Sequence, residues 1–207
     1  EMCIRDSYYP ELFKFAYGSD TITEAGVQTA LSAFVRSMVS TNSRWDTAYA
    51  QVYNAALPDK GLSLSLPGFS TQEDRGRQLF MTGPQQGGLG CAGCHVPPTF
   101  ALAANSLSNG LDAGETTVFK SPALKNIGLT GRFMHDGRFS TLEQVVEHYN
   151  SGVKAGPALD NRLKTANGTP RALNLSASDK AALAAFLRTL DDSVILVNPQ
   201  FSNPFRP

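Results

Sequence analysis

Cys91-Ala92-Gly93-Cys94-His95 is the stretch that decides the fold, because CxxCH is the attachment motif for a c-type haem. The two thiols, two residues apart, can each form a thioether to a haem vinyl group. The next residue then lies beneath the iron, so the imidazole of His95 is the expected proximal ligand. Ala92 and Gly93 are small, which suits a turn of chain that lies against a porphyrin face.

Two other kinds of site also use closely spaced cysteines. A structural zinc site usually needs two Cys/His pairs, but outside the pentapeptide the chain holds only Cys3, His135 and His148, which form no such pair. A thioredoxin-like CxxC lies between a strand and a helix, whereas GPQQGGLG at 83–90 predicts a loop with no strand before it. Covalent haem is therefore the favoured interpretation.

The composition is that of a globular protein. The 207 residues are enough for one large domain or one and a half small ones, and a hydrophobic content of 42% allows a buried core. The net charge of zero argues against nucleic acid as a partner and gives no sign of a basic membrane-binding face. No apolar run approaches the length of a membrane span.

The first ten residues, EMCIRDSYYP, contain no apolar h-region of a signal peptide. Covalent haem attachment in bacteria takes place outside the cytoplasm, so we expect a periplasmic protein whose native N-terminus is missing from this sequence. The opening EMCIRDS reads like non-native sequence joined to a fragment. No role is therefore assigned to Cys3.

Hydrophobic periodicity predicts a mainly helical chain in which five helices can be placed. A capping-box start at Thr21–Glu24 precedes a stripe expected to be buried, formed by Val27, Leu31, Phe34, Val35 and Met38. A second amphipathic helix is expected from about Arg44 to Ala56, carrying Trp45, Tyr49, Val52 and Tyr53. Pro58–Gly68 then resembles a linker between two parts of the chain.

The remaining three helices surround the haem motif in sequence. Ser70–Glu73 caps a helix that runs through Phe80, and Ser140–Glu143 starts one that ends near Asn150. The last helix starts near Ser176 or Ser178 and has an apolar face formed by Leu183, Phe186, Leu187 and Leu190. From Val96 to Lys120 no period holds, so this stretch is expected to be loop.

Three further motifs carry a family resemblance. They are FKSPALKNIGLTGRFMHDGRFSTLEQVVEHYN at 119–150, LSASDKAALAAFLRTL at 175–190 and the CAGCH pentapeptide. Together they resemble the C-terminal haem domain of the bacterial di-haem cytochrome c peroxidases and their MauG-like relatives. YPELFKFAYG at 9–18 and SAFVRSMVSTNSRWD at 32–46 are similar to the end of that family's N-terminal haem domain.

The resemblance implies a mainly α fold with two parts. Residues 68–207 would be a cytochrome c-like helical haem domain with long loops, and residues 1–60 a truncated remnant of a second cytochrome c-like domain. The sequence has no second CxxCH. Trp45 is expected to be a core aromatic, because the inter-haem tryptophan of the family belongs to a segment that this sequence lacks.

The ligand on the distal side of the iron is the main functional question. In the family it lies fourteen residues after the His of HDG, which is Tyr149 here, where cytochrome c peroxidases carry Met and MauG-like proteins carry Tyr. Helix periodicity supports Tyr149 independently, since it shares a face with Leu142 and with Val145 or Val146. Met134 ranks second, as the ligand of a simple cytochrome c, and His148 third. A plain core tyrosine is the other interpretation of Tyr149.

The resemblance also implies roles for three loop residues. His135 would lie in the haem pocket without binding iron. Thr130 and Arg132 match positions whose backbone carbonyls bind a calcium ion between the two haems. Calcium is thus a candidate second cofactor beside haem c, although its side-chain ligand would come from outside this sequence.

Two functions of different classes follow. In the first, the chain passes electrons to a peroxide-reducing haem in an N-terminal domain. The electrons would come from a cytochrome c or cupredoxin, or from a protein substrate, and hydrogen peroxide would be the oxidant. In the second, the chain is a monohaem electron-transfer protein without peroxidase activity. A thioether ligand raises the haem potential, whereas the anionic phenolate of Tyr149 lowers it, so Tyr149 favours a MauG-like oxidoreductase.

Overall fold

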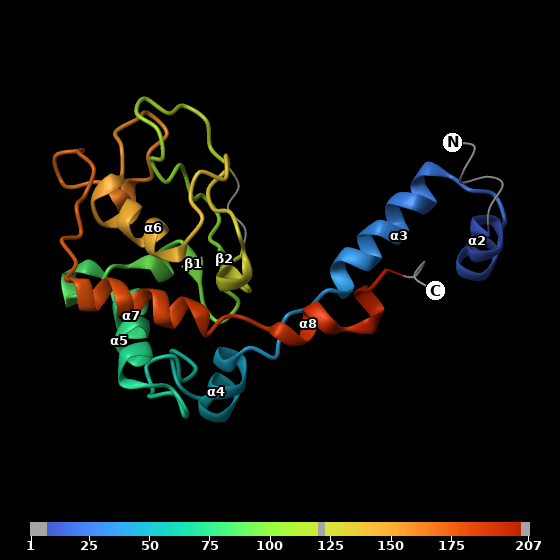
Figure 1. The fold of residues 1–207 in the computed structure, drawn as a ribbon, viewed down its shortest axis with the longest axis horizontal. Helices are drawn as coiled ribbons and strands as arrows, with labels where there is room; N and C mark the ends of the chain where they lie inside the picture. Colours follow the sequence, from blue (N-terminus) through green and yellow to red (C-terminus); the bar gives the residue numbers. More distant parts are fainter. Residues whose placement is uncertain (1–7, 120–122, 204–207) are drawn as a thin grey trace. The chain divides into compact units, whose positions relative to one another are not determined.

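The computed structural model describes residues 8–119 and 123–203, so Cys3 lies outside the described residues. The chain divides into two compact units, one with the residues up to Val39 and those from Val197, the other with Ser40–Leu196. Helices dominate (Figure 1), and β1 (His95–Val96) pairs with β2 (Ala101–Leu102) as a small antiparallel sheet. The predicted mainly helical fold is confirmed. Among the described residues, no helix combines the length and apolar character that crossing a membrane requires.

The first unit contains α2 (Tyr9–Tyr17) and α3 (Glu24–Ser37). The N-cap of α3 is Thr23, whose hydroxyl accepts a hydrogen bond from the amide of Gly26 at 3.1 Å. The predicted capping box with Thr21 as its first residue is therefore wrong by two positions. Thr23 is in extended conformation and satisfies a free amide of the first turn, which is what the N-cap position requires.

The apolar stripe of α3 is exposed, and the prediction that it is buried is wrong. No residue of α3 is buried, and the side chains of Leu31 and Val35 are 59% and 65% exposed. Periodicity predicted the amphipathic helix correctly. Burial requires a second element against that face as well, and a pattern within one helix carries no information about such an element.

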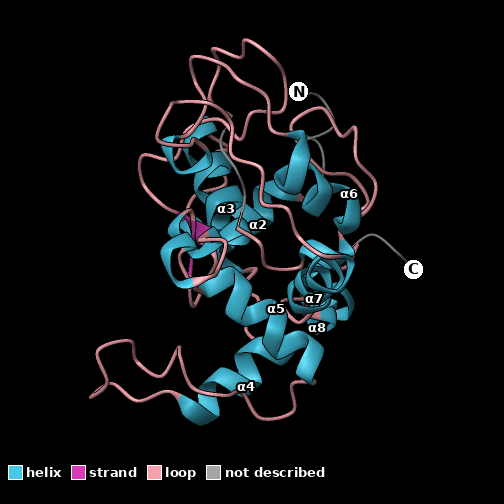
Figure 2. Ribbon diagram, turned by 90° about the vertical axis from the view of Figure 1, so that its left-hand side faces the viewer, coloured by secondary structure: helices cyan, strands magenta, loops and turns pink. Residues whose placement is uncertain are grey.

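The second unit, Ser40–Leu196, holds the haem motif and is called the haem-motif unit below. Its helices are α4 (Arg44–Val52), α5 (Thr71–Met81), α6 (Leu142–Glu147) and α7 (Ala177–Arg188), and α8 (Ser193–Val197) begins in it. Short 3₁₀ segments cover Pro84–Gln86, Cys91–Gly93, Ile127–Leu129 and Asn161–Leu163, and another, Pro199–Phe201, follows α8. Long loops connect these elements, shown in pink in Figure 2.

Side-chain caps fix where four of these helices begin, and at α4 the capping box is formed by Ser43 and Asp46. Ser70 and Glu73 form a reciprocal capping box at the start of α5, and Thr141 and Gln144 form one at the start of α6. Ser176 caps α7 by accepting a hydrogen bond from the amide of Asp179. The predicted starts of α5 and α7 are confirmed, because a cap is a local interaction that a four-residue pattern can specify. The cap of α6 lies at Thr141, one residue after the predicted Ser140.

The core of the haem-motif unit forms where α5 crosses α7 (Figure 1). Gly76 allows the crossing, since a Cβ there would overlap the carbonyl of Ala182 and lie 2.8 Å from Cβ of Phe186. The predicted apolar face of α7 is buried, with Phe186 and Leu190 fully inaccessible. The packed pair of α5 and α7 is thus the centre of the core of this unit.

Trp45 of α4 is fully buried in the same core, as predicted for a core aromatic. Its ring packs edge-on against Phe100 and Phe186, with centroid distances of 4.9 Å and 5.9 Å. The carboxylate of Asp192 binds the amide of Asn42 at 3.0 Å and the hydroxyl of Ser40. These contacts attach residues 40–52 to the core of the haem-motif unit. The predicted parts 1–60 and 68–207 were drawn from the family resemblance, and contacts within the chain do not test that division. It stays a prediction.

Candidate haem site

The CxxCH loop forms a tight turn that ends in a strand. Cys91–Gly93 is a single 3₁₀ turn, in which the amide of Cys94 donates to the carbonyl of Cys91 at 3.1 Å. His95 follows directly as the first residue of β1. Gly90, before the turn, has φ +75°, a conformation that side chains disfavour. Both cysteines are free thiols.

A cavity of about 540 Å³ lies beside this loop and is lined mainly by apolar side chains. Its volume is within the range of cofactor-binding sites. Its wall includes the predicted attachment residues Cys91, Cys94 and His95, the predicted distal ligand Tyr149, and the loop residues Thr130, Arg132, Met134 and His135. The structure therefore brings together in one cavity nearly all the residues singled out from sequence.

Desolvation dominates the electrostatics of the cavity. Burial raises the pKa of Cys91 to about 12 and lowers the pKa of His95 to about 4. Both groups are therefore neutral at pH 7 in the apoprotein. Neutral imidazole is the form that binds a metal. Burial likewise raises the pKa of Tyr149 to about 12.

Two buried nitrogens support the fit of a haem. His95 Nδ1 and Arg171 Nε are both buried without a hydrogen-bond partner among the described residues. His95 is thus free of competing protein hydrogen bonds at this atom. Arg171 is on the cavity wall, and its Nη2 donates to the carbonyl of Leu89 at 2.9 Å. An anionic group such as a haem propionate would satisfy the free Arg171 donor.

Tyr149 reaches the cavity from an irregular end of a helix. α6 ends at Glu147, and His148–Gly152 continues as a π-helical turn. Such turns occur frequently at functional sites. Leu142 and Val146 of the predicted buried face are buried. Leu142, Val145, Val146 and Tyr149 all line the cavity, as residues of one helix face would, and the role of Tyr149 as iron ligand stays a prediction.

The two rival ligands are both engaged by the protein. His148 is buried, and its Nε2 lies 3.1 Å from the carbonyl oxygen of Asn109, with the ring beside Phe139. Met134 lines the cavity with a left-handed backbone (φ +70°), and its sulfur accepts a hydrogen bond from Asn109 Nδ2 at 3.1 Å. The contacts of Asn109 were not predicted from the sequence, because it lies in the aperiodic stretch 96–120.

A pair of charged residues clamps the CxxCH loop to its surroundings. Asp160 accepts hydrogen bonds from the amide of Leu107 at 2.8 Å and from Arg162 Nη2 at 2.7 Å. Arg162 in turn donates to the carbonyl of Gly93, inside the motif, and to Ser106. Nothing in the sequence singled out this clamp, since its partners are far apart along the chain.

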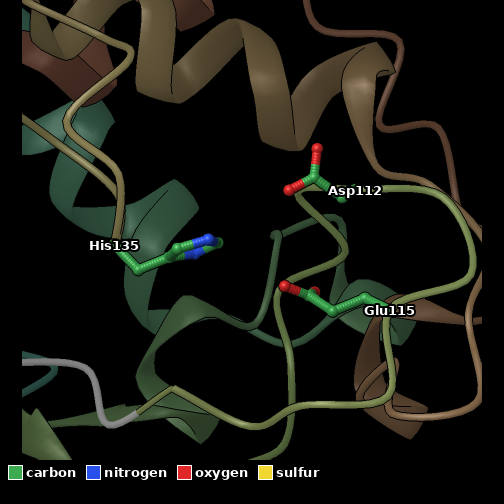
Figure 3. Close-up of side chains that lie close together, drawn as sticks. All are labelled: Asp112, Glu115 and His135. Carbon is green, nitrogen blue, oxygen red and sulfur yellow. The ribbon is translucent and has the colours of Figure 1, made fainter.

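His135 is exposed on the cavity rim and stacks on Phe119, with ring centroids 3.7 Å apart. Figure 3 shows its ring pointing toward the carboxylates of Asp112 and Glu115, and one ligand atom from each of the three lies within 4.8 Å of the others. Arg138 binds both oxygens of Asp112, at 2.9 Å and 3.0 Å. We assign no ion here, because that guanidinium already neutralises the carboxylate.

Thr130 and Arg132 are exposed and follow the 3₁₀ turn Ile127–Leu129. Both line the cavity. Their carbonyls as calcium ligands stay a prediction that rests on the family resemblance alone.

The helical fold and a CxxCH loop beside an apolar cavity define a haem protein of the cytochrome c type. The family model described as di-haem cytochrome c peroxidase matches residues 2–54 and 71–174, and the chain belongs to this family. It is 30% identical over 197 residues to the methylamine utilization protein MauG of Methylorubrum extorquens, covering 88% of this chain and 49% of that protein.

Two other comparisons agree with this assignment. The chain is 32% identical over 142 residues to cytochrome c551 peroxidase of Nitrosomonas europaea, covering 67% of this chain and 41% of that protein. A crystal structure of a MauG-like protein associated with microbial copper homeostasis matches 97% of this chain and 63% of its own, with 28% identity and a TM-score of 0.73. The chain spans about half the length of the curated relatives named here.

Proposed function

We propose that this chain is the electron-handling haem domain of a di-haem peroxidase of the MauG kind. The observation that supports it is that Tyr149 and His95 line one apolar cavity together with both motif cysteines. In the complete protein, hydrogen peroxide would react at a second haem in an N-terminal domain. The protein would act in the periplasm, where c-type haem is attached.

Each residue of the site has a defined task in this proposal. Haem c, when bound, supplies one-electron redox chemistry. Cys91 and Cys94 would attach it covalently, and His95 would bind the iron through a neutral imidazole. Arg171 would hold a propionate through the nitrogen that lacks a partner. The apolar wall excludes water, which strengthens each of these electrostatic contacts.

A tyrosine ligand at position 149 bears on which kind of electron donor the complete protein would use. A phenolate oxygen lowers the haem potential, whereas the thioether of a cytochrome c peroxidase raises it and suits electron uptake from a small cytochrome or cupredoxin. The tyrosine therefore favours a protein side chain as the electron source. We propose a protein substrate for the complete enzyme, with a small redox protein as the alternative donor.

A monohaem electron carrier is the second candidate, because the 207 residues contain a single CxxCH. Peroxide turnover separates the two functions when the isolated chain is compared with a longer chain that includes an upstream haem domain. The isolated chain should turn over peroxide with a reduced cytochrome no faster than free haem, since His95 and Tyr149 would leave no open position for peroxide. The longer chain should be active. Robust activity of the isolated chain would overturn the electron-handling role.

Covalent attachment is tested first, with the chain expressed beside a cytochrome c maturation system. Haem should stay on the chain through denaturing electrophoresis, and the double variant Cys91→Ser/Cys94→Ser should lose it. Loss of haem from the unaltered chain under the same conditions would exclude both candidate functions.

A further inference from the structure

One asparagine contacts all three side chains that could bind the distal face of the iron. Asn109 Nδ2 donates to the sulfur of Met134 at 3.1 Å, and its backbone oxygen lies 3.1 Å from Nε2 of His148. Burial raises the pKa of Tyr149, and the Asn109 side chain, which lies close enough to interact with the phenol, opposes that rise. Asn109, Met134 and Tyr149 all line the cavity.

The backbone around Asn109 is held rigidly. Ser108 is 4% exposed, and its amide and carbonyl form hydrogen bonds of 2.9 Å with Ala158 and Asp160. Gly110 has φ +67°, and a Cβ there would meet the carbonyl of Lys154 at 2.7 Å. The backbone of Asn109 is therefore fixed from both sides, so its carbonyl oxygen and the start of its side chain keep their positions.

The chemistry of an amide suits this arrangement. Thioether sulfur can only accept a hydrogen bond, so the NH₂ group of Asn109 must face Met134. An NH₂ group has two donors, and the second can serve the oxygen of Tyr149. The hydrogen bond to Met134 occupies the sulfur, and the contact with the Asn109 carbonyl occupies the ring nitrogen of His148. Each of the three groups keeps a lone pair for iron, so these contacts act by restraining where the sulfur of Met134 and Nε2 of His148 lie.

We propose that Asn109 is the positioning residue that selects Tyr149 as the distal ligand, by restraining the donor atoms of Met134 and His148 and orienting the phenol. This inference rests on the proposed function, since it requires haem in the cavity. Asn109 touches the ligands and not the reacting atoms. Its effect is therefore on which ligand binds and on the haem potential.

The decisive variant is Asn109→Leu, which keeps the size and the backbone carbonyl but removes both side-chain donors. His148 stays restrained, while Met134 and Tyr149 are released. A hydrogen bond between neutral groups contributes about 1 kcal/mol, so losing one or both should change the ratio of Met- to Tyr-ligated haem roughly 5- to 30-fold. Asn109→Asp, which lacks the donors at the same size, should act in the same direction.

The readouts are the optical spectrum and the midpoint potential of the covalent haem protein. Asn109→Leu should show the weak far-red band of Met ligation and a raised potential. Adding Met134→Leu should abolish the band and return the spectrum to Tyr ligation, which a general loss of structure would not do. Asn167→Leu, at an exposed asparagine, is the matched control and should leave the spectrum unchanged.

The outcomes separate this inference from the proposed function. If Tyr149→Phe changes the spectrum but Asn109→Leu does not, Tyr149 is the ligand and the role of Asn109 is overturned. If Tyr149→Phe leaves the spectrum unchanged, the assignment of Tyr149 fails and the inference about Asn109 fails with it. A Met band that appears in Asn109→Leu and disappears in the double variant supports the inference.

Discussion

Asp160→Asn should destabilise the chain through the clamp that holds the CxxCH loop. Hydrogen bonds from Arg162, followed by those from the amides of Leu107 and Arg162, lower the pKa of Asp160 from 3.8 to about 2. The side chain of Asp160 is 6% exposed and that of Arg162 is 38% exposed, so solvent screens the ion pair in part and the stabilisation is smaller than the full shift implies. This lowering of the pKa corresponds to at most about 2 kcal/mol of folding stability at neutral pH.

The sign of the pH dependence follows from the direction of the shift. Because the folded pKa lies below the unfolded one, the stabilisation is fully present above about pH 4. It is lost as the pH falls toward about 2, where the folded carboxylate takes up its proton. Asp160→Asn should lack this loss, since an amide does not titrate in that range.

The assay is denaturant unfolding of the covalent haem protein, measured from pH 7 down to pH 2.5. Asp160→Asn should be up to about 2 kcal/mol less stable at pH 7, and the difference should shrink as the pH falls. Asp136→Asn, at an ion pair where both side chains are more than a third exposed, is the control and should change stability far less. The reasoning is refuted if the variant and the unaltered chain lose stability in parallel below pH 4.

Two further predictions concern packing and charge. Gly76→Ala should destabilise the chain by roughly 1–3 kcal/mol in the same assay, because the added Cβ overlaps the backbone of α7. The control Gly83→Ala, whose Cβ would lie 3.9 Å from the nearest atom, should be nearly neutral. Equal effects of the two substitutions would contradict the close crossing of α5 and α7. Arg171→Leu should lower the midpoint potential of the haem, since removing a nearby cation favours the more positive, oxidised iron. A potentiometric titration that finds no shift would show that Arg171 does not face the haem.

Local patterns in the sequence predicted the local features of the structure. Ser70–Glu73 and the start of α7 were found because a cap and an apolar helix face are set by residues a few positions apart. The CxxCH motif is equally local. The same reasoning placed Tyr149 on the cavity side of the helix, although Tyr149 lies beyond α6 in the π turn His148–Gly152, which was not foreseen.

Long-range contacts account for what the sequence did not predict. The exposure of Leu31 depends on which elements pack against α3, and periodicity is silent on this. Asn109 and the Asp160–Arg162 clamp join loops that are 25 to 69 residues apart in sequence and show no repeating pattern. Such contacts are specified by the folded topology, so they become visible only in three dimensions.

The central claim is that Tyr149 binds the iron opposite His95, and the most direct test is the electron paramagnetic resonance spectrum of Tyr149→Phe with its haem attached. The ring still fills its place, so the fold should be retained while the oxygen donor is lost. The account predicts a high-spin, five-coordinate or water-bound haem with a raised potential. A low-spin spectrum identical to that of the unaltered chain would contradict it and move the ligand to Met134 or His148.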